Sequence, residues 1–342
     1  MKNQFLRLNK PGEFEFGIGE ISGDLLDEEV LLKIHQIGIC GTDYHAFRGK
    51  QPFFTYPRVL GHELGAEVIK IGNKVLGVEV GDKVAVEPYL NCGDCQPCKL
   101  GKSNCCEKLQ VLGVHTDGGM AEYIKVPFYK VHVSKKLDYQ ELATVEFLGI
   151  GAHAVKRASL NENDWVMVVG AGPIGLSVIQ FAKLQGAKVV VVDMNQERLN
   201  FAIRELGSDM AIYFDAEFNE NSIRQALNGE LPTCLFDATG NPSSMKNSFD
   251  YVSFGGKIVF VGLFIGEVEF YDPLFHRKEI SLLASRNSLP EDFKYIIQMM
   301  ENKELNINPW LSHSCKFNEL PEKINQWLEP NQLVIKALVH FD

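Results

Sequence analysis

Five of the eight cysteines lie in one short segment, between residues 92 and 106. Two residues separate Cys92 from Cys95 and Cys95 from Cys98, and Cys106 follows after seven more. Four thiolates at this spacing can complete the tetrahedral shell of a structural zinc ion, and the intervening glycine and proline supply the turns. Free or redox-active thiols are the alternative. Cys105 adjoins Cys106, so spacing alone does not decide which of these two is the fourth ligand.

A second set of potential ligands lies earlier in the chain. Cys40 opens the segment Cys-Gly-Thr-Asp-Tyr-His, and a Gly-His-Glu segment ends with His62 and Glu63. Cysteine and histidine are ligands of open zinc sites, in which a substrate can take the remaining position. Thr42 and His45 could then carry a proton to solvent. Taken alone, Cys40 could equally be an ordinary buried cysteine and His62 a satisfied core histidine.

The segment Gly170–Gly175 reads Gly-Ala-Gly-Pro-Ile-Gly, with an apolar run before it and a helical pattern after it. Asp193 ends the next apolar run. In this context Gly170 permits a tight turn, Gly172 lets the backbone approach a pyrophosphate, and Gly175 lets helix and strand pack closely. The Asp193 carboxylate would accept hydrogen bonds from ribose hydroxyls and repel a 2′-phosphate, which favours NAD over NADP. The alternative is a tight turn that binds nothing.

The elements that position these residues change in character near residue 150. Before that point, short strands are punctuated by glycine and proline, which is typical of a β-rich domain. We expect strands at 30–34, 65–70 and 83–86.

Beyond residue 150, continuous apolar runs alternate with helical patterns, which predicts a parallel sheet in an α/β domain. We expect helices at 174–184 and 195–206, and strands at 165–169, 188–193, 210–214, 234–238, 257–261 and 280–284. The last 55 or so residues hold one or two helices and a strand at 333–340.

Composition excludes several classes of protein. The 342 residues are 45% hydrophobic and have a formal net charge of −10, which suits two folded domains and argues against binding nucleic acid or an anionic membrane. The sequence lacks an apolar run long enough for a membrane helix, and the N-terminus lacks the apolar stretch of a secretory signal. We therefore expect a cytoplasmic protein.

These motifs, in this order and spacing, resemble the zinc-containing medium-chain dehydrogenases over essentially the full chain, in particular the sorbitol and threonine dehydrogenase branch. The stretches 51–63 and 285–293 look most like bacterial hexonate 5-dehydrogenases, which act on L-galactonate or L-gulonate. The resemblance implies a GroES-like domain formed by 1–147 and 287–342, which holds the zinc sites. It also implies a doubly wound Rossmann domain at 148–286.

The resemblance further implies that Cys40 and His62 bind a catalytic zinc ion, with either Glu63 or Glu146 as the third ligand. Whichever glutamate is not a ligand would then contact the zinc-bound water. Phe147 follows Glu146 where a proline is common in this branch. Asp43 matches an acid that orients the histidine ligand.

For NAD, the resemblance adds Ile174, with Arg198 near the adenine and 261–263 (Val261, Gly262 and Leu263) near the nicotinamide. It places Ser285, Arg286 and Asn287 at the carboxamide and the substrate mouth. A sugar acid has a carboxylate that a cation should meet, so Arg286 is the first candidate for that contact and Arg48 the second.

We thus expect a zinc- and NAD-dependent dehydrogenase with one catalytic and one structural zinc ion. Its substrate would be a polyhydroxylated small molecule, such as L-galactonate or L-gulonate. A polyol or L-threonine dehydrogenase is the alternative within the class, and a non-catalytic sensing protein is the alternative outside it. We expect a homodimer or a homotetramer.

Overall fold

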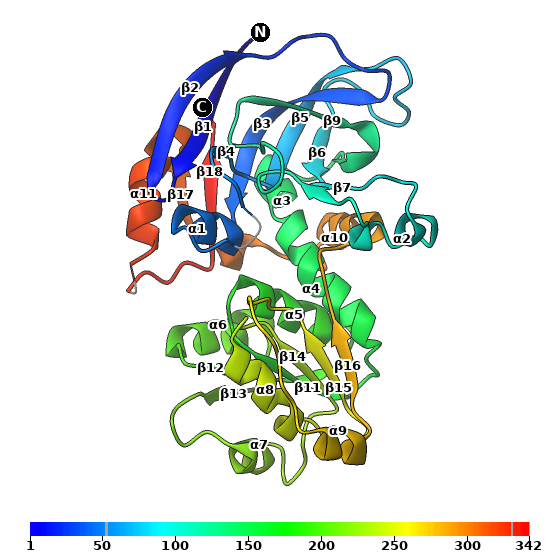
Figure 1. The fold of residues 1–342 in the computed structure, drawn as a ribbon, viewed down its shortest axis with the longest axis vertical. Helices are drawn as coiled ribbons and strands as arrows, with labels where there is room; N and C mark the ends of the chain where they lie inside the picture. The colour runs from blue at the N-terminus through cyan, green and yellow to red at the C-terminus, as the bar shows by residue number, and fades with distance from the viewer. Residues whose placement is uncertain (52–53, 330, 342) are drawn as a thin grey trace. The chain divides into compact units, whose positions relative to one another are not determined.

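The computed structural model describes residues 1–51, 54–329 and 331–341, and the chain forms two compact units. The first comprises Met1–Gly149 and Ser288–Asp342, and the second Ile150–Asn287 (Figure 1). Helix α4 (Val145–Ala158) runs across one boundary. Pro52 and Phe53, part of the stretch that resembles hexonate 5-dehydrogenases, lie outside the described residues.

The second unit is built on a parallel sheet in the order β13-β12-β11-β14-β15-β16. The order reverses between β11 and β14, as in a doubly wound sheet, and such sheets bind ligands beyond the carboxyl ends of the strands at this point. The bounds are β11 (Trp165–Val169), β12 (Lys188–Asp193), β13 (Met210–Tyr213), β14 (Cys234–Asp237), β15 (Lys257–Phe260) and β16 (Ser281–Ala284).

Helices connect these strands and cover the sheet. The side chains Val189–Val192 of β12 are fully buried, as expected of a strand covered on both faces. Helix α6 begins after Asn195, whose side chain accepts a hydrogen bond from the Arg198 N–H, and ends at Gly207 with φ of 69°. The bounds are α5 (Pro173–Leu184), α6 (Gln196–Leu206), α7 (Glu220–Ala226), α8 (Pro242–Tyr251) and α9 (Asp272–Lys278).

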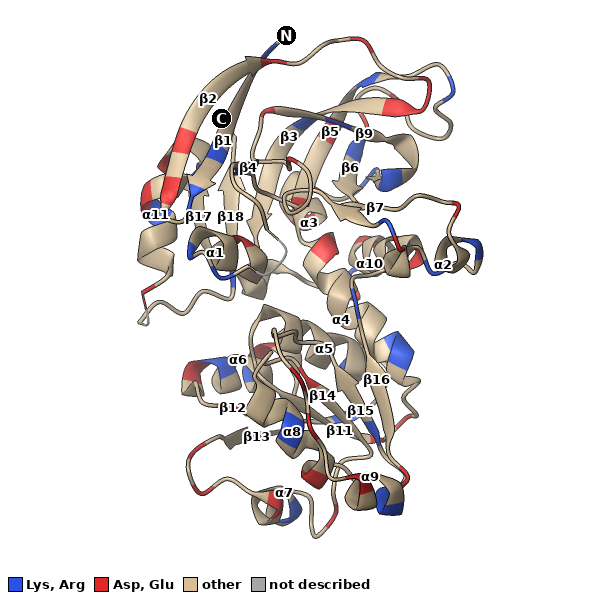
Figure 2. Ribbon diagram, viewed as in Figure 1, with Lys and Arg blue, Asp and Glu red and all other residues tan. Residues whose placement is uncertain are grey.

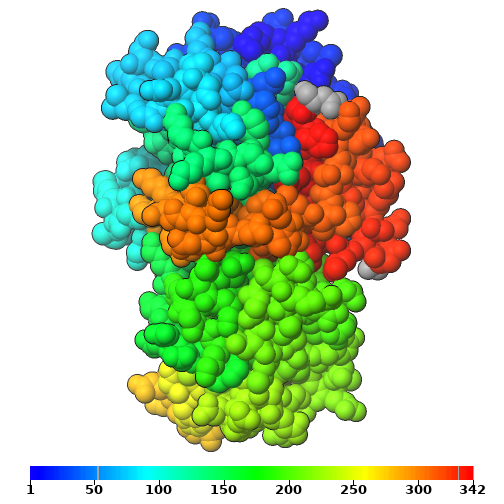
Figure 3. Space-filling model, turned by 180° about the vertical axis from the view of Figure 1, so that it is seen from behind, coloured from blue at the N-terminus to red at the C-terminus, as the bar shows by residue number. Residues whose placement is uncertain are grey.

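The first unit contains a larger, mostly antiparallel sheet in the order β10-β6-β5-β3-β18-β17, with β9 also paired to β3. Strand β18 pairs antiparallel with β3, which brings the C-terminal segment beside N-terminal residues. Figure 3 shows these orange and red C-terminal residues packed beside the blue and teal ones. The bounds are β3 (Glu29–Ile39), β5 (Glu63–Ile71), β6 (Lys83–Val86), β9 (Tyr123–Pro127), β10 (Val131–Ser134), β17 (Leu311–Lys316) and β18 (Lys336–His340).

A smaller sheet, β2-β1-β4, completes the core of this unit. Its β1 (Lys2–Lys10) buries Leu6 and Leu8, while the glutamates of β2 (Glu13–Glu20), coloured red in Figure 2, are exposed. The remaining elements are β4 (Arg58–Val59), β7 (Tyr89–Leu90), β8 (Gln110–Val111), α1 (Gly41–Phe47), α2 (Gln96–Lys99), α3 (Tyr139–Ala143), α10 (Pro290–Glu301), α11 (Leu320–Trp327) and 3-10 turns at Ser103–Cys105, Phe128–Lys130, Asn308–Trp310 and Phe317–Glu319.

The expected α/β fold with a separate β-rich domain is confirmed, and every predicted strand and helix is present with ends shifted by a few residues. Several elements were not predicted, among them strands β9 and β10 of the larger sheet. The β1–β2 hairpin precedes the first predicted strand, and β17 pairs parallel with β18 in the tail, where one strand was expected. Among the described residues, no helix is long and apolar enough to cross a membrane.

Candidate active site and metal centres

The three candidate ligands of the first metal site come from two neighbouring strands. Cys40 follows β3 and is the N-cap residue of α1, while His62 directly precedes β5 and Glu63 is its first residue. The β3–β5 register pairs Gly38 with Glu63, and a Cβ on Gly38 would lie 2.0 Å from Glu63 Oε2, so only glycine leaves room for this carboxylate. One potential ligand atom from each of Cys40, His62 and Glu63 lies within 4.8 Å of the others.

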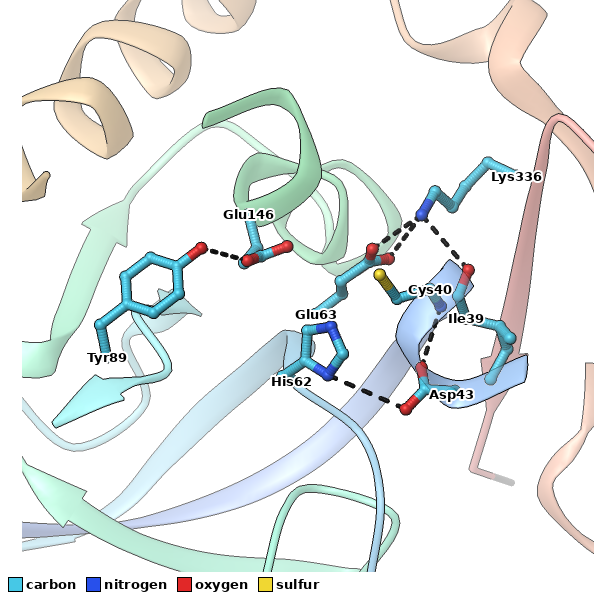
Figure 4. A network of polar contacts seen from close by, with 8 residues as sticks. All are labelled: Ile39, Cys40, Asp43, His62, Glu63, Tyr89, Glu146 and Lys336. Carbon is cyan, nitrogen blue, oxygen red and sulfur yellow. Dashed lines mark hydrogen bonds and ion pairs between the residues drawn. The ribbon is translucent and has the colours of Figure 1, made fainter. Parts of the chain in front are cut away.

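Asp43 lies beside both Cys40 and His62. Its Oδ2 accepts a hydrogen bond from the Cys40 N–H at 2.9 Å, and its Oδ1 lies 3.8 Å from His62 Nδ1. Within the described parts of the chain, this buried Nδ1 has no hydrogen-bond partner. Figure 4 shows the other ring nitrogen facing the Cys40 thiol and the glutamates. The imidazole of His62, the Cys40 thiol and the nearby carboxylates form a donor set that suits zinc, and the Asp43 carboxylate lies on the far side of the ring.

Glu63 forms a buried ion pair with Lys336 of β18. Both carboxylate oxygens lie 2.8 Å from Nζ, which also donates to the carbonyl of Ile39 at 3.3 Å. The Lys336 ammonium lies 4.2 Å from the centre of the Phe147 ring, a cation–π contact. A carboxylate has about four lone-pair positions, so a Glu63 oxygen bonded to Lys336 retains capacity for a metal.

Glu146, in the first turn of α4, also faces this cluster. It accepts a hydrogen bond from the Tyr89 hydroxyl, and both side chains are buried. Burial raises the pKa of Glu146 to about 7 and raises that of Tyr89 as well. Two buried glutamates therefore border one site, each held by a different partner.

The expected proton-carrying residues lie on α1. Thr42 is half-buried and His45 exposed, and residues three apart on a helix lie on the same face. The part of the His45 ring that is buried loses hydration, which lowers its pKa, and the nearby cations Arg48 and Lys50 lower it further. A neutral imidazole near neutral pH can accept a proton. Arg48 donates a hydrogen bond to the carbonyl of Leu328 at 3.1 Å.

The second metal centre is the cysteine lobe. One sulfur from each of Cys92, Cys95, Cys98 and Cys106 lies within 4.8 Å of the others, and the Cys95–Cys98 distance is 3.4 Å. Backbone N–H groups of 107 and 98 lower the pKa of Cys95 to about 6, which favours the thiolate. Cys105 is exposed and does not belong to the group, so the fold selects Cys106, which spacing alone did not.

The glycine loop lies at the carboxyl end of β11 in the second unit, where its glycines have distinct constraints. Gly170 has φ of 93°, a conformation that side chains rarely adopt. A Cβ on Gly175 would lie 1.8 Å from the Gly170 carbonyl oxygen, so the close packing of helix and strand excludes any side chain at position 175. A Cβ on Gly172 would meet only Arg198 Nη1, at 3.7 Å. This open space precedes the N-terminus of α5, where backbone N–H groups can bind phosphate.

Asp193, the last residue of β12, faces this loop. It accepts hydrogen bonds from the Ala171 N–H at 2.6 Å and the Asn195 N–H at 2.7 Å. Arg198 Nε is buried and has no partner in the part of the chain that the structure describes. A buried guanidinium nitrogen without a partner suits a site that a polar ligand completes. Ile174 lies in the first turn of α5.

The other predicted cofactor residues follow the carboxyl ends of β15 and β16. The N–H groups of Val261 and Gly262 both donate to the Asp237 carbonyl at 2.9 Å, and Leu263 is exposed. In the segment Ser285–Asn287, a hydroxyl and an amide nitrogen are buried without partners among the described residues. The sheet thus collects the predicted cofactor residues at one edge, where doubly wound sheets bind nucleotides.

Sequence reasoning missed Lys336 and Tyr89. Lys336 interrupts the apolar run 333–339, and a lone lysine in a buried strand requires a partner, which was a usable signal. Tyr89 follows a proline beside the cysteine lobe, and nothing in its local pattern indicates that its hydroxyl meets a glutamate 57 positions away.

Comparisons with known proteins place the chain among dehydrogenases. Residues 26–136 match the alcohol dehydrogenase GroES-like domain family and residues 173–302 the zinc-binding dehydrogenase family. The chain is 42% identical over 315 residues to L-galactonate-5-dehydrogenase of Escherichia coli K12, covering 92% of each. It is 34% identical over 321 residues to the starvation-sensing protein RspB of the same strain, again covering 92% of each.

Among solved structures, the chain matches one described as a short chain alcohol dehydrogenase (rspB) from E. coli CFT073 complexed with the cofactor NADH. The TM-score is 0.93 and the sequences are 32% identical, and the match covers 99% of each chain. The match therefore includes residues of both units of this chain.

Proposed function

This chain belongs to the zinc-binding dehydrogenases with an alcohol dehydrogenase GroES-like domain, and on that premise we propose that it is an NAD-dependent dehydrogenase of hexonates, such as L-galactonate or L-gulonate. The class, an oxidoreductase that acts on a polyol or a sugar acid with zinc and a nicotinamide cofactor, follows from the family. The juxtaposition of Cys40, His62 and Glu63 is the observation that supports catalysis.

In this proposal Cys40, His62 and Glu63 hold the catalytic zinc ion and the four clustered cysteines hold the structural one. When bound, the catalytic zinc ion makes the substrate hydroxyl more acidic, and NAD accepts the hydride. The Asp43 carboxylate lies 3.8 Å from His62 Nδ1 and favours the ring orientation that directs the other nitrogen to the metal, and the Lys336 ammonium offsets the charge of the Glu63 carboxylate. The metal position thereby carries little excess negative charge, which suits the binding of a neutral hydroxyl group of the substrate.

The proton that leaves the alcohol would pass along α1. Thr42, half-buried, is the first group and His45, exposed, is the one that meets solvent. Because burial and neighbouring cations lower its pKa, His45 is neutral near pH 7 and can accept this proton. A protein that only binds ligands has no need of such a path. The intact pair therefore favours turnover over the sensing role suggested by the name of one relative.

The similarity to L-galactonate-5-dehydrogenase supports a hexonate as the substrate. The test is the initial rate of NADH formation, followed by absorbance, with L-galactonate, L-gulonate, sorbitol and L-threonine at matched concentrations. We expect the hexonates to have the highest kcat/KM. Cys40→Ser should abolish this rate and leave NAD binding, measured by NADH fluorescence, unchanged, because Cys40 and the glycine loop lie in different units.

Other outcomes contradict the proposal at different levels. A higher kcat/KM with sorbitol or threonine would refute the hexonate assignment and leave the dehydrogenase class intact. Binding of NADH without turnover of any of the four compounds would favour the sensing role. Equal activity of the Cys40→Ser protein would refute the assignment of the catalytic metal site.

A further inference from the structure

Two carboxylates compete for the space in front of Cys40 and His62. Glu63 belongs to the group whose ligand atoms lie within 4.8 Å of one another, whereas Glu146 does not, although Figure 4 shows it facing the same space. A catalytic zinc site requires three protein ligands and one open position, while a fourth protein ligand makes a closed, structural site. Something must therefore keep Glu146 from completing the shell.

Each glutamate is held by a different buried partner. Lys336 contacts both oxygens of Glu63 from the side of β18. The Tyr89 hydroxyl donates to Oε1 of Glu146 from the side of β7. This bond leaves Glu146 with free lone pairs, so its effect is on where the carboxylate lies, which is outside the group formed by Cys40, His62 and Glu63. Tyr89 is 2% exposed and Glu146 5%, so water does not offer either group an alternative partner at low cost.

The Tyr89 ring is also fixed in place. It packs edge-on against Phe293 of α10 with 6.5 Å between ring centres, and β7 pairs with β8, where Tyr89 lies opposite Val111. A rigid ring points its hydroxyl in one direction only. The donor is thus preorganised, and Glu146 forms the hydrogen bond without ordering another group.

We propose that Tyr89 is a positioning residue, whose hydroxyl holds Glu146 away from the metal and so keeps the fourth coordination position open for the substrate. This inference rests on the proposed function, because it requires a zinc ion at Cys40, His62 and Glu63. Without the Tyr89 donor, Glu146 would be a buried carboxylate lacking its partner, and a nearby cation is the strongest alternative.

The decisive variant is Tyr89→Phe, which removes the hydroxyl and retains the ring. Cobalt replaces zinc in the full-length protein, and imidazole is added while the visible spectrum is recorded. Imidazole binds only where a coordination position is open, so the four-cysteine site is silent in this assay. We expect the unsubstituted protein to bind imidazole and Tyr89→Phe to bind it about tenfold or more weakly, consistent with the loss of one charged hydrogen bond.

Two further variants separate positioning from a general loss of structure. In Tyr89→Phe/Glu146→Gln, the side chain no longer has the charge that draws it to the metal, so imidazole binding should return. Tyr139→Phe is the matched control, because the Tyr139 hydroxyl also contacts a glutamate, Glu67, at 3.5 Å, but outside the metal cluster. It should bind imidazole like the unsubstituted protein.

Metal release to a chelator provides a second readout. A closed site releases metal more slowly, so Tyr89→Phe should lose cobalt more slowly and turn over more slowly at the same time. Faster loss of metal, or unchanged imidazole binding, would overturn the inference that Tyr89 holds Glu146 away. If the unsubstituted protein takes up no metal at Cys40, the proposed function itself fails, an outcome distinct from both.

Discussion

At the scale of single residues, we propose that Asp193 has two roles, one in the geometry of the glycine loop and one in the choice of cofactor. Its oxygens accept hydrogen bonds from the N–H groups of Ala171 and Asn195, which ties the glycine loop to the start of α6. A carboxylate at the end of the second strand also accepts hydrogen bonds from ribose hydroxyls and repels a phosphate. On this proposal, loop geometry and cofactor choice are coupled through one side chain.

Replacing Asp193 with asparagine tests this coupling. The N–H groups of Ala171 and Asn195 bond to different oxygens of Asp193. Asparagine has only one oxygen, so it can replace one of these two contacts, and its NH2 group would face the other N–H donor. We expect kcat/KM for NAD to fall about tenfold, and the preference for NAD over NADP to shrink because the repelling charge is gone.

Steady-state kinetics with both cofactors provide the measurement, with the exposed Asp215→Asn as control. A natural preference for NADP would show that the role assigned to Asp193 is wrong.

At the scale of elements, the turn from β11 into α5 shows why similar glycines are not equivalent. Gly175 is required for packing, because its Cβ position lies 1.8 Å from the Gly170 carbonyl oxygen. Gly172 is the N-cap residue of α5 with φ of −71°, which any residue can adopt, and its Cβ position is nearly open. The fold alone therefore requires glycine at position 175 but not at position 172.

A pair of alanine substitutions separates folding from cofactor binding. Gly175→Ala should destabilise the protein by roughly 2–4 kcal/mol, because backbone atoms must move apart. Gly172→Ala should change stability by less than about 0.5 kcal/mol, yet weaken NADH binding because the new methyl group occupies the phosphate approach.

Denaturant unfolding and NADH fluorescence titration measure the two effects. Gly172→Ala with full NADH affinity would mean that the pyrophosphate does not pass this residue.

At the scale of the whole molecule, the chemistry is divided between the two units. Both candidate metal centres lie in the first unit, and the glycine loop with Asp193 lies in the second. The cysteine lobe is supported by few elements of its own, chiefly α2, one 3-10 turn and the short β7–β8 pair. A metal ion is thus expected to supply much of the local order there.

Metal content tests this division. Carefully prepared protein should contain about two zinc ions per chain, and Cys92→Ser should reduce this to about one and lower the Tm. Cys105→Ser is the matched control, because its thiol is exposed and outside the group, so zinc content should not change. One zinc ion per chain in the unsubstituted protein, retained after Cys92→Ser, would exclude a structural zinc site in the lobe.

Local patterns were sufficient to predict the strands of the parallel sheet, and they also singled out the glycine loop and the cysteine lobe. The parallel strands are continuous apolar runs such as 189–192, and a strand buried on both faces must have that composition. The residues of the glycine loop, and likewise those of the cysteine lobe, are close together in sequence, so the spacing between them was enough to predict a phosphate-binding turn and a zinc site. Edge elements with weaker patterns, such as β2 with its exposed acidic residues and β17 in the tail, were not predicted.

Only the tertiary structure decided which partners meet across long separations. Lys336 reaches Glu63 because β18 pairs with β3 beside β5, and the Tyr89 hydroxyl reaches Glu146 because β7 and α4 converge on one buried space. Tertiary structure also determines that Cys106 rather than Cys105 joins the other three cysteines, and that Glu63 and Glu146 have different hydrogen-bond partners. Buried polar groups are stabilised by whichever partner the fold brings within hydrogen-bond distance, and that distance is set by strand pairing rather than by sequence neighbours.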